Sequence, residues 1–148
     1  HLILVNIDDL IAVVDLEGKR LYNSPSYERI FGNRVKLRGT DSFSNVHPDD
    51  REQLKQVFIN TVKTGVGKRT RYRFLLDDGS VRHIESQGNV IRGKDGEPAK
   101  IVIVSRDVTE EKHAIDALMS SEERFRTVFE EAAVPKARKN FLKKTLER

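Results

Sequence analysis

The chain has 148 residues, a formal net charge of +4 and no cysteine. The absence of cysteine excludes disulfides, thiolate metal sites and cysteine nucleophiles, and the length suits one domain with an appendage. No apolar run approaches the roughly 18 residues of a membrane span, and no signal-peptide pattern is visible. Because the chain begins at His1 and not at Met, we expect it to be a fragment of a longer protein.

Positive charge is concentrated in the last part of the chain. Residues 134–148 carry six Lys or Arg against one Glu, a balance of +5, so residues 1–133 sum to −1. We therefore do not expect the body of the chain to bind nucleic acid. We interpret the tail as exposed or non-native. The open alternative is a basic amphipathic segment that binds a membrane surface, an acidic partner or nucleic acid.

The first half of the chain predicts a hairpin and two helices. Leu10–Asp15 and Lys19–Tyr22 are strand-like runs separated by a glycine turn. A short helix over residues 26–31 follows, with Ser24 as its N-cap and Pro25 in its first turn.

The clearest helix begins at Pro48. Proline suits the first helical position, and the two aspartates after it face the positive end of the helix dipole. Side chains at i, i+3, i+4, i+7 and i+8 then predict one stripe facing the core: Leu54, Val57, Phe58, Thr61 and Val62.

Three β-prone segments follow this helix. Arg69–Leu76, Val81–Ile91 and Pro98–Val104 are joined by tight turns, and the last is apolar enough for a central strand. With the N-terminal hairpin they predict a five-stranded antiparallel sheet. Helices on one face of that sheet give an α+β fold.

A strand passes directly into a helix at residues 105–112. Thr109 suits an N-cap, and the two glutamates after it suit the first helical turn. Asp107 can accept hydrogen bonds from nearby backbone N–H groups. We expect this junction, made by Asp107, Val108 and Thr109, to hold the angle between the domain and a helix over 110–133.

The helix over 110–133 carries an apolar stripe at the 3-4 spacing of a coiled coil. Its members are Ile115, Leu118, Phe125 and Phe129, with Glu122 as a polar position and Ala132 at the end. The stripe predicts a homodimer, and the open alternative is a helix that folds back on its own sheet. The capping-box pattern Ser120–Glu123 predicts a restart or kink.

The order of these elements resembles a PAS domain with its trailing PAC segment, the sensory module of bacterial signalling proteins. The residues that carry the resemblance are Asp15–Gly18, Tyr22–Pro25, Glu28–Gly32, His47–Asp50, Tyr72–Phe74, Asp78–Gly79 and Arg106–Thr109. Ser121–Glu130 is similar to the segment that leads into the next PAS repeat in tandem proteins. The resemblance implies the end of a preceding helix at 1–9, the PAS/PAC domain at 10–109, a connector helix at 110–133 and a tail at 134–148.

In this family a small-molecule pocket lies between the long helix and the inner face of the sheet. The resemblance therefore implies a candidate pocket at Val57, Phe58, Thr61, Tyr72, Phe74, Ile84, Ser86, Val102 and Val104. Tyr72 and Ser86 could supply the few polar groups of a ligand site. The open alternative is an ordinary filled core.

The resemblance also bears on cofactors. The flavin photoadduct of light-sensing relatives needs a Cys and is excluded. Haem-binding relatives ligate iron through a His in the long helix, which has none after His47, so we do not expect haem. We interpret His83 as a sheet-surface residue and expect no metal site. His113 lacks the acidic neighbour of a phosphorylated kinase His, so we do not expect it to accept phosphate.

We therefore expect a cytoplasmic PAS sensory module of a signal-transduction protein, such as a sensor histidine kinase of a two-component system, and not an enzyme. A change induced by a ligand or partner would pass through the Asp107–Thr109 junction to a dimerising helix. The expected partners are a second copy, a neighbouring PAS or output domain and a possible small molecule. The alternative is a ligand-free spacer that dimerises and sets the distance between signalling domains.

Overall fold

The computed structural model describes residues 5–33, 36–132 and 146. The predictions for residues 1–4 and for the basic tail, apart from position 146, lie outside the described residues. The chain divides into two units, His1–Thr109 and Glu110–Arg148. The first unit holds the sheet, the core and the candidate site.

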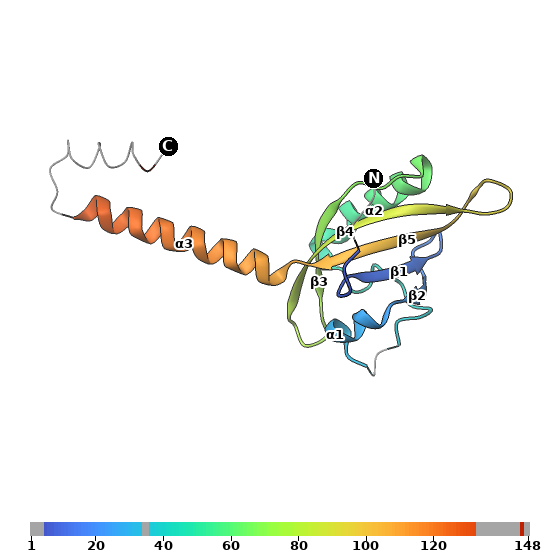
Figure 1. The fold of residues 1–148 in the computed structure, drawn as a ribbon, viewed down its shortest axis with the longest axis horizontal. Helices are drawn as coiled ribbons and strands as arrows, with labels where there is room; N and C mark the ends of the chain where they lie inside the picture. The colour runs from blue at the N-terminus through green and yellow to red at the C-terminus, as the bar shows by residue number, and fades with distance from the viewer. Residues whose placement is uncertain (1–4, 34–35, 133–145, 147–148) are drawn as a thin grey trace. The chain divides into compact units, whose positions relative to one another are not determined.

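Five strands form one antiparallel sheet in the order β2-β1-β5-β4-β3 (Figure 1). They are β1 (Leu10–Val14), β2 (Arg20–Asn23), β3 (Thr70–Leu75), β4 (Val81–Arg92) and β5 (Pro98–Asp107). The apolar strand β5 is central and pairs with β1 on one side and β4 on the other. The predicted five-stranded antiparallel sheet and α+β class are confirmed.

The helical segments are η1 (Pro25–Tyr27), α1 (Glu28–Phe31), α2 (Pro48–Thr64) and α3 (Thr109–Glu131). Helix α2 begins as predicted, because Pro48 is its first residue and the Nδ1 atom of His47 accepts a hydrogen bond from the Asp49 N–H. It ends at Gly65, whose φ of 84° favours glycine. Side chains of η1, of α2 and of one face of the sheet line the same cavity. Both helical segments therefore lie on one face of the sheet, as predicted for the α+β fold.

The short N-terminal helix differs from its prediction. The hydroxyl oxygen of Ser24 does not cap it, and instead accepts a hydrogen bond from the Ile11 N–H at 2.9 Å and bonds the Ser26 hydroxyl. This side chain therefore ties the segment to β1. The segment itself is a 3-10 turn followed by a single α-helical turn.

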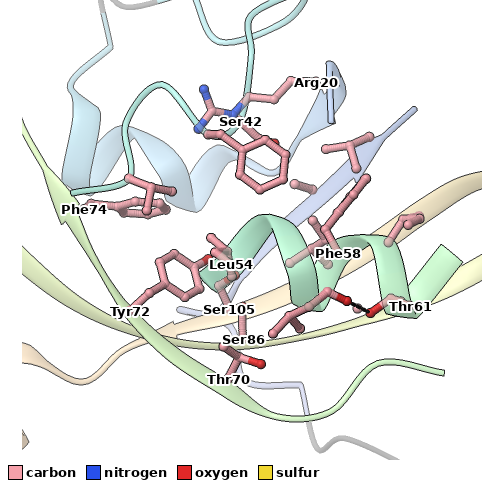
Figure 2. Close-up of a pocket in the computed structure, with 18 of the residues that line it drawn as sticks. Arg20, Ser42, Leu54, Phe58, Thr61, Thr70, Tyr72, Phe74, Ser86 and Ser105 are labelled. Carbon is pink, nitrogen blue, oxygen red and sulfur yellow. Dashed lines mark hydrogen bonds between the residues drawn. The ribbon is translucent and has the colours of Figure 1, made fainter. Parts of the chain in front are cut away.

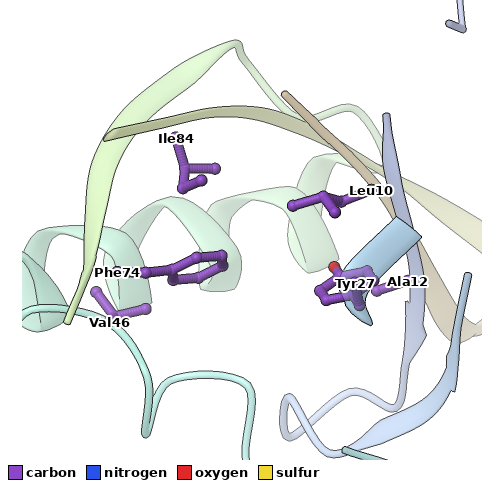
Figure 3. Packing of buried hydrophobic residues seen from close by; sticks show 6 residues of the cluster. All are labelled: Leu10, Ala12, Tyr27, Val46, Phe74 and Ile84. Carbon is purple, nitrogen blue, oxygen red and sulfur yellow. The ribbon is translucent and has the colours of Figure 1, made fainter. Parts of the chain in front are cut away.

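A cluster of buried side chains packs on the inner face of the sheet (Figure 3). Its members are Leu10, Ala12, Tyr27, Val46, Phe74 and Ile84, and each is at most 5% exposed. Alternate residues of a strand face the same side, so β1 supplies Leu10 and Ala12 to the core. The ring of Phe31 packs on that of Phe74, with centroids 5.4 Å apart.

Residues 5–9, expected to end a helix, contain a turn instead. The Asn6 N–H donates to the Asp9 carboxylate at 2.8 Å, and the Asp9 N–H donates to the Asn6 carbonyl at 3.0 Å. The Asp9 side chain is nearly buried and forms an ion pair with Arg106 on β5. These contacts fix the chain just before β1 to the central strand.

Helix α3 is continuous over 23 residues. The predicted restart at Ser120 is wrong, because the residues around it include no Gly or Pro to interrupt the i→i−4 hydrogen bonds. Lys112 and Asp116 form one of its surface ion pairs at i,i+4 spacing. Within the described ranges, no helix is both long enough and apolar enough to cross a membrane.

Replacement of Ile84 by alanine should test the core. Its side chain is 0% exposed, so Ile84→Ala leaves a cavity and should lower the free energy of unfolding by about 2–5 kcal/mol. Ile91→Ala on the same strand is the matched control, since Ile91 is 40% exposed, and should cost less than about 1 kcal/mol. Urea denaturation measures both, and equal losses would contradict this packing.

Candidate functional site

A cavity of about 70 Å³ lies between α2 and the inner face of the sheet (Figure 2). Its walls are mostly apolar, and they include the polar side chains of Thr61, Tyr72, Ser86 and Ser105. The cavity has room for a few water molecules or for a ligand of a few non-hydrogen atoms.

Six of the nine residues predicted for the pocket line this cavity. They are Val57, Phe58 and Thr61 on α2, Tyr72 and Phe74 on β3, and Ser86 on β4. The seventh, Ile84, is fully buried in the core cluster beside it. These residues are therefore brought together, while their use as a ligand site stays a prediction.

The placement of Val102 and Val104 on the inner face was wrong. Ser86 lines the cavity and pairs with Ser105, so Ser105 shares its face. Because side chains alternate along a strand, Val102 and Val104 face the other side of the sheet. Their places on the cavity wall are taken by Ile101, Ile103 and Ser105.

Arg20 also lines the cavity, and sequence reasoning missed it. It is only 2% exposed, although it belongs to a short strand next to a turn. The β1–β2 register shifts between Val13 and Val14, so that Val14 pairs with Arg20 and Val13 with Tyr22. Val14 faces the cavity, and the shift turns Arg20 toward the same side.

Burial governs the protonation of the polar groups around the cavity. It lowers the pKa of Arg20 and raises the pKa of both Tyr27 and Tyr72. For Tyr72, the neighbouring hydroxyls of Ser86 and Ser105 act in the opposite direction to burial. Both tyrosines are therefore neutral at physiological pH and can act as hydrogen-bond donors.

An ion pair fixes the N-terminal end of α2 to β3. The Asp50 carboxylate accepts hydrogen bonds from the Arg73 backbone N–H at 2.9 Å, from Nε at 3.0 Å and from Nη2 at 2.9 Å. These bonds, led by the one to the Arg73 side chain, hold the pKa of Asp50 below its usual value. The pair anchors the helix that forms one wall of the cavity.

The strand-to-helix junction (Asp107, Val108 and Thr109) forms one hydrogen-bond network with β4. The Thr109 Oγ1 atom accepts from the His83 N–H at 2.7 Å and donates to the Asp107 carboxylate, which also accepts from the Thr109 N–H at 2.9 Å. The second carboxylate oxygen of Asp107 accepts from Arg82 Nε at 2.7 Å. The end of β5, the start of β4 and the first residue of α3 are thereby joined.

The prediction that Thr109 is the N-cap was wrong in its detail. Thr109 is the first helical residue, and the Asp107 carboxylate accepts the hydrogen bond from its N–H. The Thr109 hydroxyl oxygen instead accepts a hydrogen bond from the His83 N–H of β4. Val108 lies between them, 6% exposed, and its N–H donates to the His83 carbonyl at 2.8 Å.

The predicted stripe of α3 is largely exposed in the single chain. Ile115, Leu118 and Phe125 are 55%, 71% and 57% exposed. Phe129 is half-buried, and its ring stacks on Phe125 with centroids 6.3 Å apart. Pairing of two such helices stays a prediction.

The described chain holds no group of three or more His, Asp or Glu side chains placed to bind a metal ion. His47 serves α2 as its N-cap, and His83 contributes both its backbone N–H and its carbonyl to the junction.

Comparison with known proteins shows the family. The model described as PAS fold matches residues 20–105, and the sheet order and helices agree with it. The chain belongs to the PAS family, whose members are sensory modules.

Two of the relatives carry the names of signal-transduction proteins. The chain is 29% identical over 79 residues to the probable diguanylate cyclase DgcE of Escherichia coli, and 32% identical over 87 residues to the two-component sensor PprA of Pseudomonas aeruginosa. These matches cover 53% and 59% of this chain but only 7% and 9% of the relatives.

A solved structure of a sensory box histidine kinase/response regulator from Burkholderia thailandensis is 26% identical, with a TM-score of 0.60. The match covers 81% of this chain and 92% of that one. The domain is therefore homologous to sensor domains of signal-transduction proteins.

The ion pair between Asp50 and Arg73 predicts that the free energy of unfolding depends on pH. Because the folded pKa of Asp50 is lowered, its ionised form stabilises the fold above the unfolded pKa of about 4, and this stabilisation is lost as pH falls through the folded value. Asp50→Asn should therefore unfold more readily than the parent at pH 7, and the difference should vanish at strongly acidic pH.

Asp49→Asn is the matched control, because Asp49 shares the first turn of α2 but its side chain is 78% exposed. Urea denaturation at pH 7 and at pH values well below 4 measures both variants. A difference for Asp50→Asn that is the same at every pH would contradict the assignment.

Proposed function

We propose that this PAS domain transmits a signal through the Asp107–Thr109 junction to α3, and that α3 pairs with the same helix of a second copy. A ligand or partner that binds one conformation of the domain better than another would shift the population between them. A change in the sheet would then alter how the helix begins, and an output domain would respond. The parent protein would be a sensor kinase, a cyclic-dinucleotide enzyme or a similar signalling protein.

The observation that carries this proposal is the position of the Thr109 hydroxyl. It bonds the backbone of β4 through the His83 N–H and the end of β5 through Asp107. A displacement of either strand therefore acts directly on the first residue of α3. An ordinary helix cap, which bonds only its own helix, would lack this link to the sheet.

The exposed stripe of α3 supports pairing with a second copy. Five large apolar side chains of this helix (Ile115, Leu118, Met119, Phe125 and Val128) are each more than half exposed. Apolar residues at 3-4 spacing are buried in two-stranded coiled coils. A homodimer would remove this surface from water.

A ligand-free spacer is the second candidate function, and the small cavity volume favours it. A cavity of about 70 Å³ leaves little room for a ligand. In this second function the domain would dimerise and set the distance between signalling domains without binding a ligand. The two functions differ in whether output depends on a signal at the domain.

Disruption of the junction tests the first proposal. Asp107→Ala should lower the free energy of unfolding by about 0.5–2 kcal/mol, as loss of a cap does. Thr109→Ala should lower it by about 0.5–1.5 kcal/mol, as loss of a hydrogen bond does. In the full-length protein both should remove the dependence of output on the signal. Thr127→Ala is the control, because that hydroxyl bonds the Glu123 carbonyl within α3. Normal regulation in both junction variants would exclude this role.

A charge placed on the stripe tests pairing. Leu118→Glu should dissociate the dimer, because a carboxylate would be buried at the helix contact. Ser120→Glu is the control on another face of the same helix. Sedimentation equilibrium of the whole chain measures the mass. A monomeric parent chain, or an unchanged dimer in Leu118→Glu, would contradict the proposed pairing.

A further inference from the structure

Arg20 is a cation buried without a carboxylate partner. The residue is 2% exposed, and it takes part in none of the ion pairs formed by the described residues. The exposed carboxylate of Asp41 influences its protonation less than burial does. Proteins rarely bury a charge in this way unless it is paired or has a function.

One part of the Arg20 guanidinium is already used. Nη1 donates to the Thr40 hydroxyl at 3.0 Å and to the Asn45 side-chain oxygen at 2.9 Å, and the group lies over the Phe31 ring. Both acceptors are neutral. In the part of the chain that the structure describes, Nε and Nη2 form no hydrogen bond. These two N–H groups make the fork that binds the two oxygens of a carboxylate.

The wall of the cavity is positively charged overall. Arg20 and Lys68 are its charged members, and no Asp or Glu is present among the residues that line it. Arg20 lies at the opposite end of the labelled side chains from Ser86 and Thr70 (Figure 2). The remainder of the wall is mostly apolar. A molecule with one anionic end and a small apolar body matches this distribution.

We propose that the cavity binds a short-chain monocarboxylic acid, with the Nε and Nη2 groups of Arg20 holding its carboxylate. This deepens the proposed function, because it rests on the domain being a sensor and names the chemistry of its signal. The volume limits the ligand, since about 70 Å³ is roughly half of an engineered cavity of about 150 Å³ that accepts benzene. Acids of about two to four carbons therefore fit best.

Inorganic phosphate fits this site less well. A phosphate carries up to two negative charges, one more than the single Arg20 guanidinium neutralises, and burying the excess charge against a mostly apolar wall is costly. A carboxylate needs two donors on one side only. The acid is therefore favoured over other small anions.

Titration of the whole chain with acetate, propanoate and butanoate tests the proposal. The matched amides acetamide, propanamide and butanamide have nearly the same shape without the charge. At least one acid should bind ten or more times more tightly than its amide, as loss of a charged hydrogen-bond pair predicts. Calorimetry gives the affinity, and methyl NMR of Ile101 and Ile103 reports binding in the cavity.

Three variants test whether the acid binds in this cavity and through Arg20. Arg20→Met should lose at least ten-fold in acid affinity, whereas Arg71→Met, on an exposed side chain, should leave it unchanged. Val57→Phe keeps Arg20 but fills the cavity, and should also abolish binding. This second route keeps the test decisive if Arg20→Met does not fold.

Several outcomes would overturn the proposal. They are equal affinity for acid and amide, no binding of any of the three acids, binding of inorganic phosphate as tight as that of the acids, or full binding in Val57→Phe. Such a failure is separable from failure of the proposed function. If no acid binds but output still depends on Asp107 and Thr109, the ligand class is wrong and the transmission role stands.

Discussion

The rest of this structure depends on the two hydrogen bonds of the Thr109 hydroxyl group. Its oxygen accepts a hydrogen bond from the His83 N–H of β4, and the hydroxyl donates one to Asp107 at the end of β5. Asp107 in turn accepts from the Thr109 N–H and from Arg82. Two neighbouring strands and the first residue of α3 therefore share one network. In the proposed mechanism this network converts a change in the sheet into a change at the start of the helix.

Much of the fold could be predicted from the sequence, because its signals are local. Pro48 with two following aspartates marks the start of α2, and glycine turns separate β3, β4 and β5. The pattern Arg106–Thr109 marks the junction, and the structure adds that Asp107 accepts the helix N–H while Thr109 bonds the strand. Six of the candidate pocket residues, which the resemblance to the PAS family implied, also meet at the cavity.

The features of the site that the sequence did not predict depend on pairing between distant segments of the chain. The run Ile101–Val104 is apolar at every position, so its inward face is set by the partner strand β4 and not by its own pattern. Arg20 faces inward only because the β1–β2 register shifts at Val14. A charged side chain in a short hairpin strand is ordinarily expected in water. The side chain that would hold the proposed acid is therefore the one that the sequence alone could not place.

Backbone hydrogen exchange in Thr109→Val tests the central claim most directly. Valine keeps the shape of threonine but removes the hydroxyl that joins β4 to α3. The account predicts faster exchange at the His83 amide and, together with it, at residues 112–115, the first amides of α3 that can bond carbonyls at the start of the helix. Faster exchange at His83 alone, with these amides of the helix unchanged, would show that the sheet and the helix are not coupled through this group.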